Sequence, residues 1–261
     1  MIGYNHLGKN GRLGNQMFQY AALRGIAAKK EYDFLIPESN FEDEWNHHQL
    51  FEAFVLSNLK NTGYISENFY KEKENGTHIF DSDYVNNCPD NVSLYGFFQT
   101  EKYFQHIAES IREDFTFKDK ILNPCKEEFS FDKIISLHIR RGDYIKKSYY
   151  HPLCEFEYYE SALEKFDSNI PVMIFSDDPT WCKNQSIFSS DRFMVSDTGW
   201  NIIDLCLMSM CSHHIIANSS FSWWGAWLSG SNNVIAPKKW YGPAAEKILT
   251  DDLIPERWQT L

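Results

Sequence analysis

Apolar and polar positions in the second half of the chain predict short buried strands that alternate with amphipathic helices. Short, mostly apolar runs are followed by longer segments in which apolar side chains recur every three or four positions. Strands that alternate with helices favour a parallel, doubly wound sheet. The predicted strands are 133–139, 171–176, 191–196, 213–217 and 232–237, and the predicted helices are 156–166, 200–211 and 221–230.

The first half of the chain has a less regular pattern. Residues 38–75 carry polar and aromatic residues without a clear period, and we expect loops and short helices there. A change of pattern near residues 118–130 divides the chain into two α/β domains, which we place at 1–125 and 126–261. The other predicted elements are a helix over 15–30, strands over 32–37 and 92–98, and a helix over 100–115 with Thr100 as its N-cap.

Composition narrows the classes of ligand. The chain has 261 residues and a formal net charge of −11, which argues against general binding to nucleic acid or to an anionic membrane. An anion would therefore be bound locally, by a few placed groups. The six cysteines are scattered without a C-x-x-C pair and are expected to be reduced thiols. The chain shows no secretory signal and no apolar stretch of membrane-spanning length, so a cytoplasmic location is expected.

Two adjacent arginines, Arg140 and Arg141, directly follow the apolar strand 133–139. In parallel α/β sheets, ligands bind beyond the carboxyl ends of the strands. A guanidinium group matches phosphate oxygens with two parallel hydrogen bonds, and Gly142 allows the backbone to turn there. The alternative is an ordinary salt bridge with Asp143 or another acid.

Two further strand ends carry polar groups. Asn218, Ser219 and Ser220 begin a helix, where backbone N–H groups and side-chain donors can bind an anion. The alternative is an ordinary N-cap. Asp177 and Asp178 follow strand 171–176 and are suited to bind a metal or a ribose, or to cap the next helix.

Asp204 lies among apolar residues in the predicted helix 200–211. A carboxylate near an apolar face needs a donor. Guanine offers two adjacent N–H donors that one carboxylate can accept, whereas uracil does not. The alternative is an exposed acid on the polar face of the helix.

Two short patterns carry little weight. Residues 3–10 match the spacing of a phosphate-binding P-loop, but Asn10 stands where the Ser or Thr ligand of Mg²⁺ is needed, and no full strand precedes it. Asp81 and Asp83 match the D-x-D pattern of metal-dependent glycosyltransferases, although so short a pattern arises often by chance.

Five segments in order together resemble the bacterial α-1,2-fucosyltransferases of glycosyltransferase family 11. The resemblance runs from residue 11 to about 240, and the related α-1,6-fucosyltransferases share the HxRRxD pattern. Arg12 differs, since the family usually has a second glycine there. The segments are "GRLGNQMFQYAAL", "GFFQTEKYF", "HIRRGDY", "FSDDPTWC" and "NSSFSWWGAWLS".

This resemblance implies a GT-B-like fold, with two Rossmann-type domains that face each other across a cleft. It implies GDP-β-L-fucose as donor, inversion at the fucose anomeric carbon, and transfer to the 2-hydroxyl group of a galactose-terminated glycan. It also implies that neither a metal nor another cofactor is needed. By the same resemblance, domain 1–125 is expected to bind the acceptor and domain 126–261 the donor. We expect no nucleic-acid partner, and we expect a location in the cytoplasm or, peripherally, at the cytoplasmic face of the inner membrane.

The same resemblance implies roles for particular residues. The implied guanine contacts are His138 and Asp204, and the implied β-phosphate contacts are Arg140 and Ser220, with Ser219 and Asn218 beside them at the helix start. Arg141 is implied to be needed for activity, and Asp177 and Asp178 for the integrity of the site. Asn15 and Gln16 are expected to face the cleft.

The base that takes the acceptor's proton is a separate question, for which Asp143 is the candidate. Its alternative role is to hold Arg140 or Arg141 in place. Two alternatives to the whole function remain: a fucosyltransferase of another linkage, and an inactive module that binds a GDP-sugar.

Overall fold

The computed structural model describes residues 1–39, 48–72 and 78–261. The chain divides into two compact units, the first formed by residues 1–118 and 247–255 and the second by residues 119–246 and 256–261. The expected border after residue 125 is wrong in detail, because it would cut helix α5 (Asp119–Glu128), which packs against α8 (Asn201–Met210) inside the second unit. The return of residues 247–255 to the first unit was not predicted.

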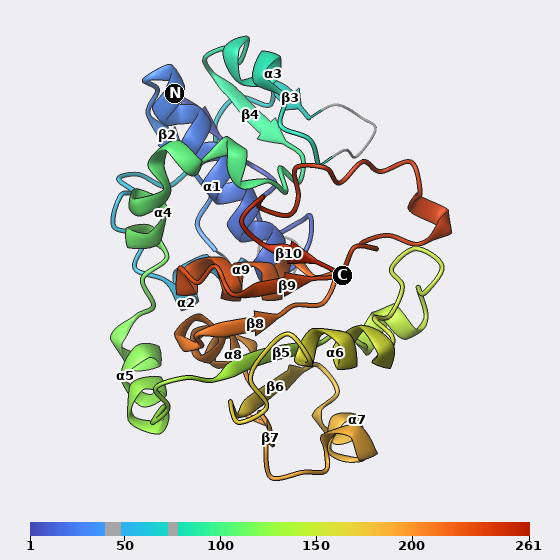
Figure 1. Cartoon of the computed structure of the whole chain (residues 1–261). Helices are drawn as coiled ribbons and strands as arrows, with labels where there is room; N and C mark the ends of the chain where they lie inside the picture. The colour runs from blue at the N-terminus through green and yellow to red at the C-terminus, as the bar shows by residue number, and fades with distance from the viewer. Residues whose placement is uncertain (40–47, 73–77) are drawn as a thin grey trace. The chain divides into compact units, whose positions relative to one another are not determined.

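The first unit contains a sheet of four parallel strands in the order β2-β1-β4-β3 (Figure 1). Ile2 of β1 pairs with Phe34 of β2 on one side and with Val92 of β4 on the other. The strands are β1 (Ile2–Gly3), β2 (Phe34–Leu35), β3 (Phe69–Lys71) and β4 (Val92–Tyr95). The helices are α1 (Leu13–Lys30), α2 (Leu50–Ala53), α3 (Ser82–Asn86) and α4 (Ala108–Asp114), with 3₁₀ turns η1 (Glu101–Tyr103) and η2 (Gln105–Ile107).

The helix predicted over 100–115 is wrong in its first half, where η1 and η2 replace the α-helix. Tyr103 and Phe104 are consecutive and both buried. The Tyr103 carbonyl oxygen also lies so close to Gly25 of α1 that a Cβ atom on Gly25 would be 2.0 Å from it. The Thr100 cap is confirmed, since its hydroxyl accepts a hydrogen bond from the Lys102 N–H at 3.2 Å.

Two other predictions in this unit need correction. The strand predicted over 92–98 ends at Tyr95, because the backbone of Phe98 is left-handed (φ 52°) and cannot continue the strand. The strand predicted over 32–37 is reduced to β2, with an isolated bridge at Ile36. Residues 38–75 contain the expected short helix, α2, and also the unpredicted strand β3; residues 40–47 and 73–75 of that prediction lie outside the described residues.

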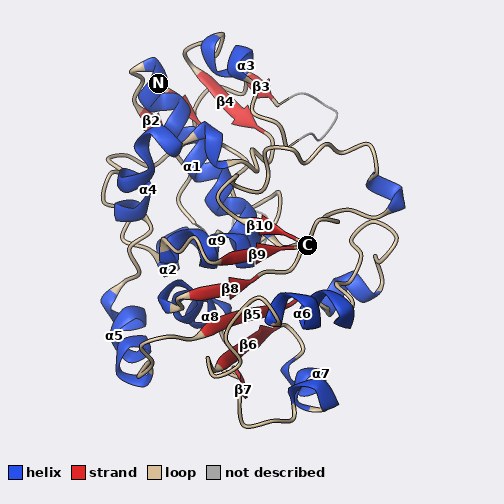
Figure 2. Ribbon diagram, viewed as in Figure 1, coloured by secondary structure: helices blue, strands red, loops and turns tan. Residues whose placement is uncertain are grey.

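The second unit contains a sheet of six parallel strands in the order β10-β9-β8-β5-β6-β7 (Figure 2). All five strands and three helices predicted here are present, with shifted ends, whereas β10, α5 and α7 were not predicted. The strands are β5 (Ile135–Ile139), β6 (Val172–Ser176), β7 (Phe193–Val195), β8 (His213–Ile215), β9 (Val234–Ala236) and β10 (Gln259–Thr260). The remaining helices are α6 (Phe156–Leu163), α7 (Pro179–Lys183) and α9 (Ser220–Ser229), with 3₁₀ turns η3 (Gly142–Ile145), η4 (Ser186–Phe188) and η5 (Pro243–Ala245).

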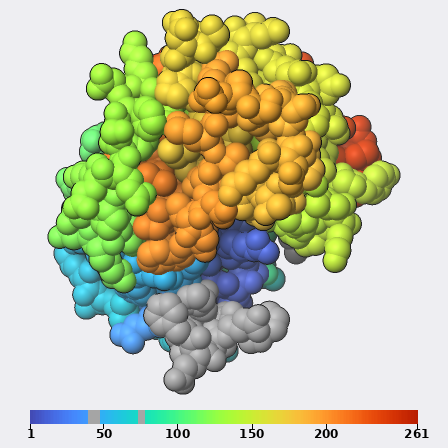
Figure 3. Space-filling view, turned by 90° about the horizontal axis from the view of Figure 1, so that it is seen from below, coloured from blue at the N-terminus to red at the C-terminus, as the bar shows by residue number. Residues whose placement is uncertain are grey.

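Alternation along β5 explains how the sheet is covered. Ile135, Leu137 and Ile139 point to one face, where they belong to a core with buried residues of α6 and α7. His138 points to the other face and contacts Phe221 of α9. The space-filling view of Figure 3 shows the gold-to-orange segments around β6, α7 and β7 at the surface of this unit. No helix of the described residues is long and apolar enough to cross a membrane.

Candidate active site

The order of the strands brings the three polar strand ends of the sequence together. β8, β5 and β6 are neighbours, and at their carboxyl ends they carry Asn218, Arg140 and Asp177 respectively. From β5 the chain continues outward to β6 and β7, and then crosses back to β8 on the other side of β5. Such a switch point opens a crevice at the carboxyl ends of the strands, which is where α/β sheets bind their ligands.

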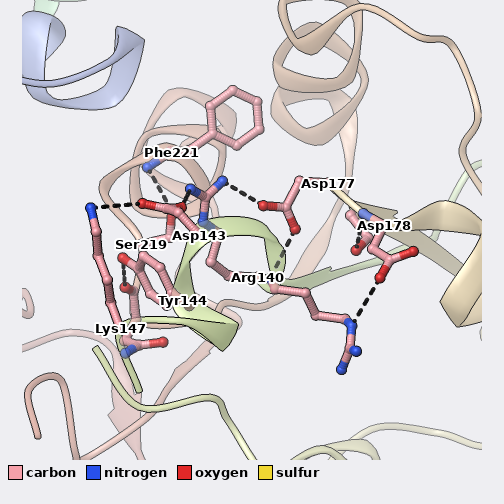
Figure 4. A network of polar contacts seen from close by, with 11 residues as sticks. Arg140, Asp143, Tyr144, Lys147, Asp177, Asp178, Ser219 and Phe221 are labelled. Carbon is pink, nitrogen blue, oxygen red and sulfur yellow. Dashed lines mark hydrogen bonds and ion pairs between the residues drawn. The ribbon is translucent and has the colours of Figure 1, made fainter. Parts of the chain in front are cut away.

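Arg140 lies at the centre of a network of ion pairs (Figure 4). Its Nη1 atom lies 2.8 Å from Oδ2 of Asp177, its Nη2 atom donates to Oδ1 of Asp143, and its guanidinium carbon lies 5.0 Å from the centre of the Tyr144 ring. Asp143 also pairs with Lys147 at 3.5 Å. The Arg140 side chain is only 16% exposed, so the guanidinium is fixed in direction and partly withdrawn from water.

Arg141 turns away to a second acid. Its Nε atom donates to Oδ2 of Asp178 at 3.2 Å, and its guanidinium carbon lies 3.7 Å from the centre of the Trp181 ring. Its backbone N–H donates to Oδ1 of Asp177 at 2.8 Å, so one carboxylate holds both arginine residues. Asp178 also caps α7, because its Oδ1 atom accepts from the Trp181 N–H at 3.1 Å. The expected capping role is therefore confirmed for one of the two acids.

Gly142 allows Asp177 to approach the arginine loop. Its φ angle is +21°, and a Cβ atom at this position would lie 2.3 Å from Oδ2 of Asp177. The loop therefore needs glycine so that Asp177 can reach Arg140 and Arg141.

Both arginines make the salt bridges that the alternative interpretation expected. Three cations (Arg140, Arg141, Lys147) face three carboxylates (Asp143, Asp177, Asp178). An equal number of cations and carboxylates is also typical of ion-pair networks on solvated surfaces. Two features distinguish this network: its arginine side chains are only 16% and 17% exposed, and it lies at the switch point of the sheet.

Asn218 holds the loops together. Its side-chain amide nitrogen donates to the carbonyl oxygens of Pro152 and Trp240, each at 2.9 Å, and its backbone carbonyl oxygen accepts from the Tyr144 hydroxyl at 3.1 Å. Since its amide donors are used inside the protein, Asn218 lies beside the site as a positioning residue, unlike the donor contact implied by the resemblance.

The start of α9 lies beside the arginine loop. Ser219 is its N-cap, with the hydroxyl accepting from the Phe221 N–H at 3.3 Å, and Ser220 is the first residue of the helix. The expected N-cap is confirmed, and it coexists with the anion-binding character of a helix N-terminus.

His138 is buried beneath this helix start, 5.8 Å from the Phe221 ring. Burial, together with the Arg140 charge, lowers the pKa of His138 to about 3, so the imidazole is neutral. Its Nδ1 atom is buried without a hydrogen-bond partner within the described residues.

Asp204 lies in the first turn of α8 and is half-buried, which rules out a fully solvated acid. Its Oδ1 atom accepts from the hydroxyl groups of Ser196 at 2.7 Å and Thr198 at 2.9 Å. Burial raises the pKa of Asp204 above its usual range, and these two hydrogen bonds oppose the rise. Its Oδ2 atom makes no hydrogen bond with the residues that the structure describes.

Asn15 and Gln16 lie in the first unit, in the first turn of α1. Oδ1 of Asn15 accepts from the Gln99 amide at 2.8 Å, and Oε1 of Gln16 accepts from the Gln49 N–H at 3.0 Å. Both side chains therefore join loops within this unit.

The D-x-D pattern has a local structural role. Oδ1 of Asp81 accepts from the Tyr84 N–H at 3.0 Å and caps α3, whose first turn contains Asp83. Within the described residues, no three His, Cys, Asp or Glu side chains gather as metal ligands.

Sequence inspection missed three contributors to the site. Tyr144, Lys147 and Trp181 support the ion-pair network, although Tyr144 and Trp181 lie inside segments that the resemblance had singled out. For Tyr144 and Lys147 the signal was a spacing of four positions from Arg140 and from Asp143, at which side chains can meet. Trp181 carried no such local signal, because its partner Arg141 is distant in the sequence.

The model of glycosyl transferase family 11 matches residues 1–260. The chain belongs to glycosyl transferase family 11. It is a glycosyltransferase, and it is 34% identical to the alpha-1,2-colitosyltransferase of Escherichia coli, over 95% of both chains. It is 25% identical to galactoside alpha-(1,2)-fucosyltransferase 1 of Homo sapiens, over 86% of this chain and 65% of that one.

Solved structures extend the likeness to the fold. POFUT1 in complex with GDP superposes with a TM-score of 0.57 at 11% sequence identity, over 90% of this chain and 96% of that one. This likeness and the two parallel sheets confirm the GT-B-like α/β fold class.

Proposed function

We propose that the protein transfers L-fucose from GDP-β-L-fucose to the 2-hydroxyl group of a terminal galactoside, with inversion at the fucose carbon. The observation that carries this proposal is the partly buried Arg140, held by two carboxylates beside the N-terminus of α9 at the switch point of the second sheet. The similarity to enzymes named for α-1,2 transfer supports the linkage.

In this reaction the bond between fucose C1 and the β-phosphate oxygen breaks, and its electron pair stays on GDP. Arg140 and the backbone N–H groups at the start of α9 stabilise the negative charge that grows on the β-phosphate. Because GDP leaves without protonation, no acid of the glycosidase type is needed. Donors aimed at such a charge are each worth on the order of 10²–10³ in rate.

Two other side chains of the second unit, Asp204 and His138, bind the guanine base in this proposal. The open Oδ2 atom of Asp204 can accept from guanine N–H groups, and the neutral His138 offers its Nδ1 atom. Asp177 keeps both arginines in place, so its role is to position the phosphate contacts.

The carboxylate of Asp143 pairs with Arg140 and Lys147. Taking up a proton would break both ion pairs, so this geometry favours the holding role of Asp143 over the role of base.

The test is the release of GDP from GDP-fucose with lactose or N-acetyllactosamine as acceptor, together with analysis of the product linkage. Acceptor-dependent release with an α-1,2 product supports the proposal. Transfer with another linkage would refute the 2-hydroxyl assignment. Tight GDP binding without acceptor-dependent release would show an inactive binding module.

A second donor is favoured by one observation, the 34% identity to an alpha-1,2-colitosyltransferase. Colitose is fucose without its 3-hydroxyl group. A comparison of kcat/KM for GDP-fucose and GDP-colitose decides between them, since a site built to bind the 3-hydroxyl group rejects the sugar that lacks it.

A further inference from the structure

The loop that follows the arginine pair exposes large side chains next to the donor site. Residues 145–150 are all exposed, and among them Ile145, Tyr149 and Tyr150 are 49%, 70% and 41% exposed. Single exposed apolar side chains are common on protein surfaces and need no explanation, whereas a concentration of them marks an interaction site. The donor site described above uses none of these three side chains, so their exposure calls for another role.

A series of ring contacts joins this loop to the donor site. The Tyr144 ring, whose centre lies 5.0 Å from the guanidinium carbon of Arg140, stacks on the His151 ring at 4.6 Å and 13° (Figure 4). His151 in turn contacts Tyr150 at 4.6 Å and Tyr241 at 5.7 Å, and the rings of Tyr150 and Tyr241 meet edge to face at 5.8 Å. All five residues belong to the second unit, so the exposed rings and the arginine loop are parts of one compact body.

Backbone hydrogen bonds hold the loop in place. The Tyr150 N–H donates to the Lys147 carbonyl oxygen at 2.8 Å. The carbonyl oxygens of Tyr149 and Tyr150 accept from the N–H groups of Ala244 at 3.0 Å and Gly242 at 2.8 Å. Gly242 permits this approach, because a Cβ atom there would lie 2.5 Å from the Tyr149 carbonyl oxygen. A ligand that binds to a loop held in this way has little backbone freedom to freeze, which favours its affinity.

The chemistry of these side chains suits a carbohydrate. The hydroxyl groups of Tyr149 and Tyr150 make no hydrogen bond with the residues that the structure describes. An exposed tyrosine offers an apolar ring face and a hydroxyl group that can both donate and accept. A sugar presents the matching surface, with C–H groups on its ring face and hydroxyl groups around its edge. Tyr149, Tyr150 and Tyr241 are called the aromatic platform below.

The position of the aromatic platform indicates which sugar it meets. In the proposed function the reacting galactose lies beside the β-phosphate, which Arg140 binds. The platform lies further out, since the His151 ring stands between the rings of Tyr144 and Tyr150 in the series of contacts. A glycan that places its terminal galactose beside the phosphate can therefore reach the platform with the sugars that follow the galactose.

We propose that the aromatic platform binds the acceptor glycan at the sugars that follow the reacting galactose. This proposal rests on the proposed function, and it extends acceptor binding, which the resemblance assigned to domain 1–125, to the second unit. The Tyr149 ring packs against a sugar face, and the hydroxyl groups of Tyr149 and Tyr150 form hydrogen bonds with sugar hydroxyl groups. The platform makes the enzyme prefer an extended acceptor over a single galactoside, and it takes no part in the chemical step.

The experiment measures transfer to two acceptors, methyl β-D-galactoside and a tetrasaccharide of two N-acetyllactosamine units. The wild type should have the higher kcat/KM with the tetrasaccharide. The Tyr149 side chain makes no ring contact or hydrogen bond with the described residues, so Tyr149→Ala should leave the loop in place. This variant should raise the KM for the tetrasaccharide by about 2- to 10-fold, the range for one aromatic contact. Replacing Tyr150 by alanine as well should raise it by about 5- to 100-fold, while kcat/KM for methyl β-D-galactoside and the affinity for GDP stay unchanged.

Two further variants separate sugar binding from the structure of the loop. Ser148→Ala, at an exposed position of the same loop, is the matched control and should behave as the wild type with both acceptors. Tyr149→Phe keeps the ring and should retain most of the affinity for the tetrasaccharide. An unchanged KM for the tetrasaccharide in the double variant, an equal loss with both acceptors, or a wild type without preference between them would overturn the proposal. A wild type that transfers fucose to neither acceptor would refute the proposed function, and the role of the platform with it.

Discussion

Asp204→Asn tests how the second unit recognises guanine. Oδ1 of Asp204 already accepts two hydroxyl hydrogen bonds, so Oδ2 is the atom that remains open for guanine. Pairing through both oxygens at once, as the sequence suggested, would require Ser196 or Thr198 to turn away. The structure therefore lowers the free energy that Asp204 is expected to contribute to guanine binding. One charge-assisted hydrogen bond contributes about 1.5–3 kcal/mol.

That free energy converts to a loss of GDP affinity of roughly 10- to 100-fold, since each 1.4 kcal/mol is tenfold. If the amide keeps its oxygen towards the two hydroxyl groups, its NH₂ group faces the guanine donors and the loss is at the upper end. If the side-chain amide rotates so that its oxygen faces guanine, only the charge is lost, and the loss of GDP affinity is at the lower end of this range. Calorimetric titration with GDP measures the change directly.

The stability of the ligand-free protein should move in the opposite direction. The folded-state pKa of Asp204 is raised above its unfolded value, so its ionisation costs folding free energy, a cost that appears as pH rises through this window and is complete above it. Asp204→Asn removes the charge, and its thermal midpoint at pH 7 should equal or exceed that of the wild type.

The matched control is Asp197→Asn, an exposed acid that pairs with Lys183 at 2.6 Å near the start of α8. It removes the same charge without touching the open oxygen, and GDP affinity should change little. An Asp204→Asn variant that binds GDP as tightly as the wild type, or an equal loss in both variants, would refute the guanine contact.

Four further outcomes are expected, three for transfer activity and one for thermal stability. Arg140→Lys should lower the transfer rate by roughly 10²-fold, because lysine keeps the charge but loses the planar fork; near-wild-type turnover with an intact circular dichroism spectrum would leave Arg140 a salt-bridge residue. Gly142→Ala should push Asp177 off Arg140 and lower turnover by roughly tenfold or more, on the cost of misplaced catalytic groups, with little change in secondary structure. Activity should persist in excess EDTA, and complete loss restored by Mn²⁺ or Mg²⁺ would contradict the metal-free mechanism. Glu72→Gln should raise the thermal midpoint at pH 8 and not at pH 4, because a carboxyl pKa raised to about 7 costs stability only as the pH rises through the window from its unfolded value to about 7.

The pattern of apolar and polar positions in the second half was enough to predict five of the six strands of its sheet. Strands such as β5 are buried on both faces and read as short apolar runs, whereas the helices between them are longer segments, and this difference in length distinguishes the two. Because parallel strands end at one edge of a sheet, the sequence also placed Arg140, Asp177 and Ser219 at one place. The sequence determined the donor side to this extent because each motif directly follows a strong strand signal.

The tertiary structure decided everything that depends on partners distant in the sequence. Tyr103 and Phe104 leave the helical path because α1 packs against their backbone. Asp204 is satisfied by Ser196 and Thr198, which precede its helix and carry no pattern of their own. Asn218 looks like a ligand donor in the sequence, yet its amide is used by two carbonyl oxygens from other loops.

Glu72 is the clearest example of a residue whose surroundings the sequence does not predict. It lies in a segment without a clear apolar period, for which the sequence predicts only loops and short helices. Its burial comes from a turn that begins at Gly96, and its orientation comes from the N–H groups of Phe97 and Phe98, which converge only because Phe98 is left-handed. Local propensity does not encode these contacts, because they form only when β3 and β4 pair and bring their carboxyl ends together.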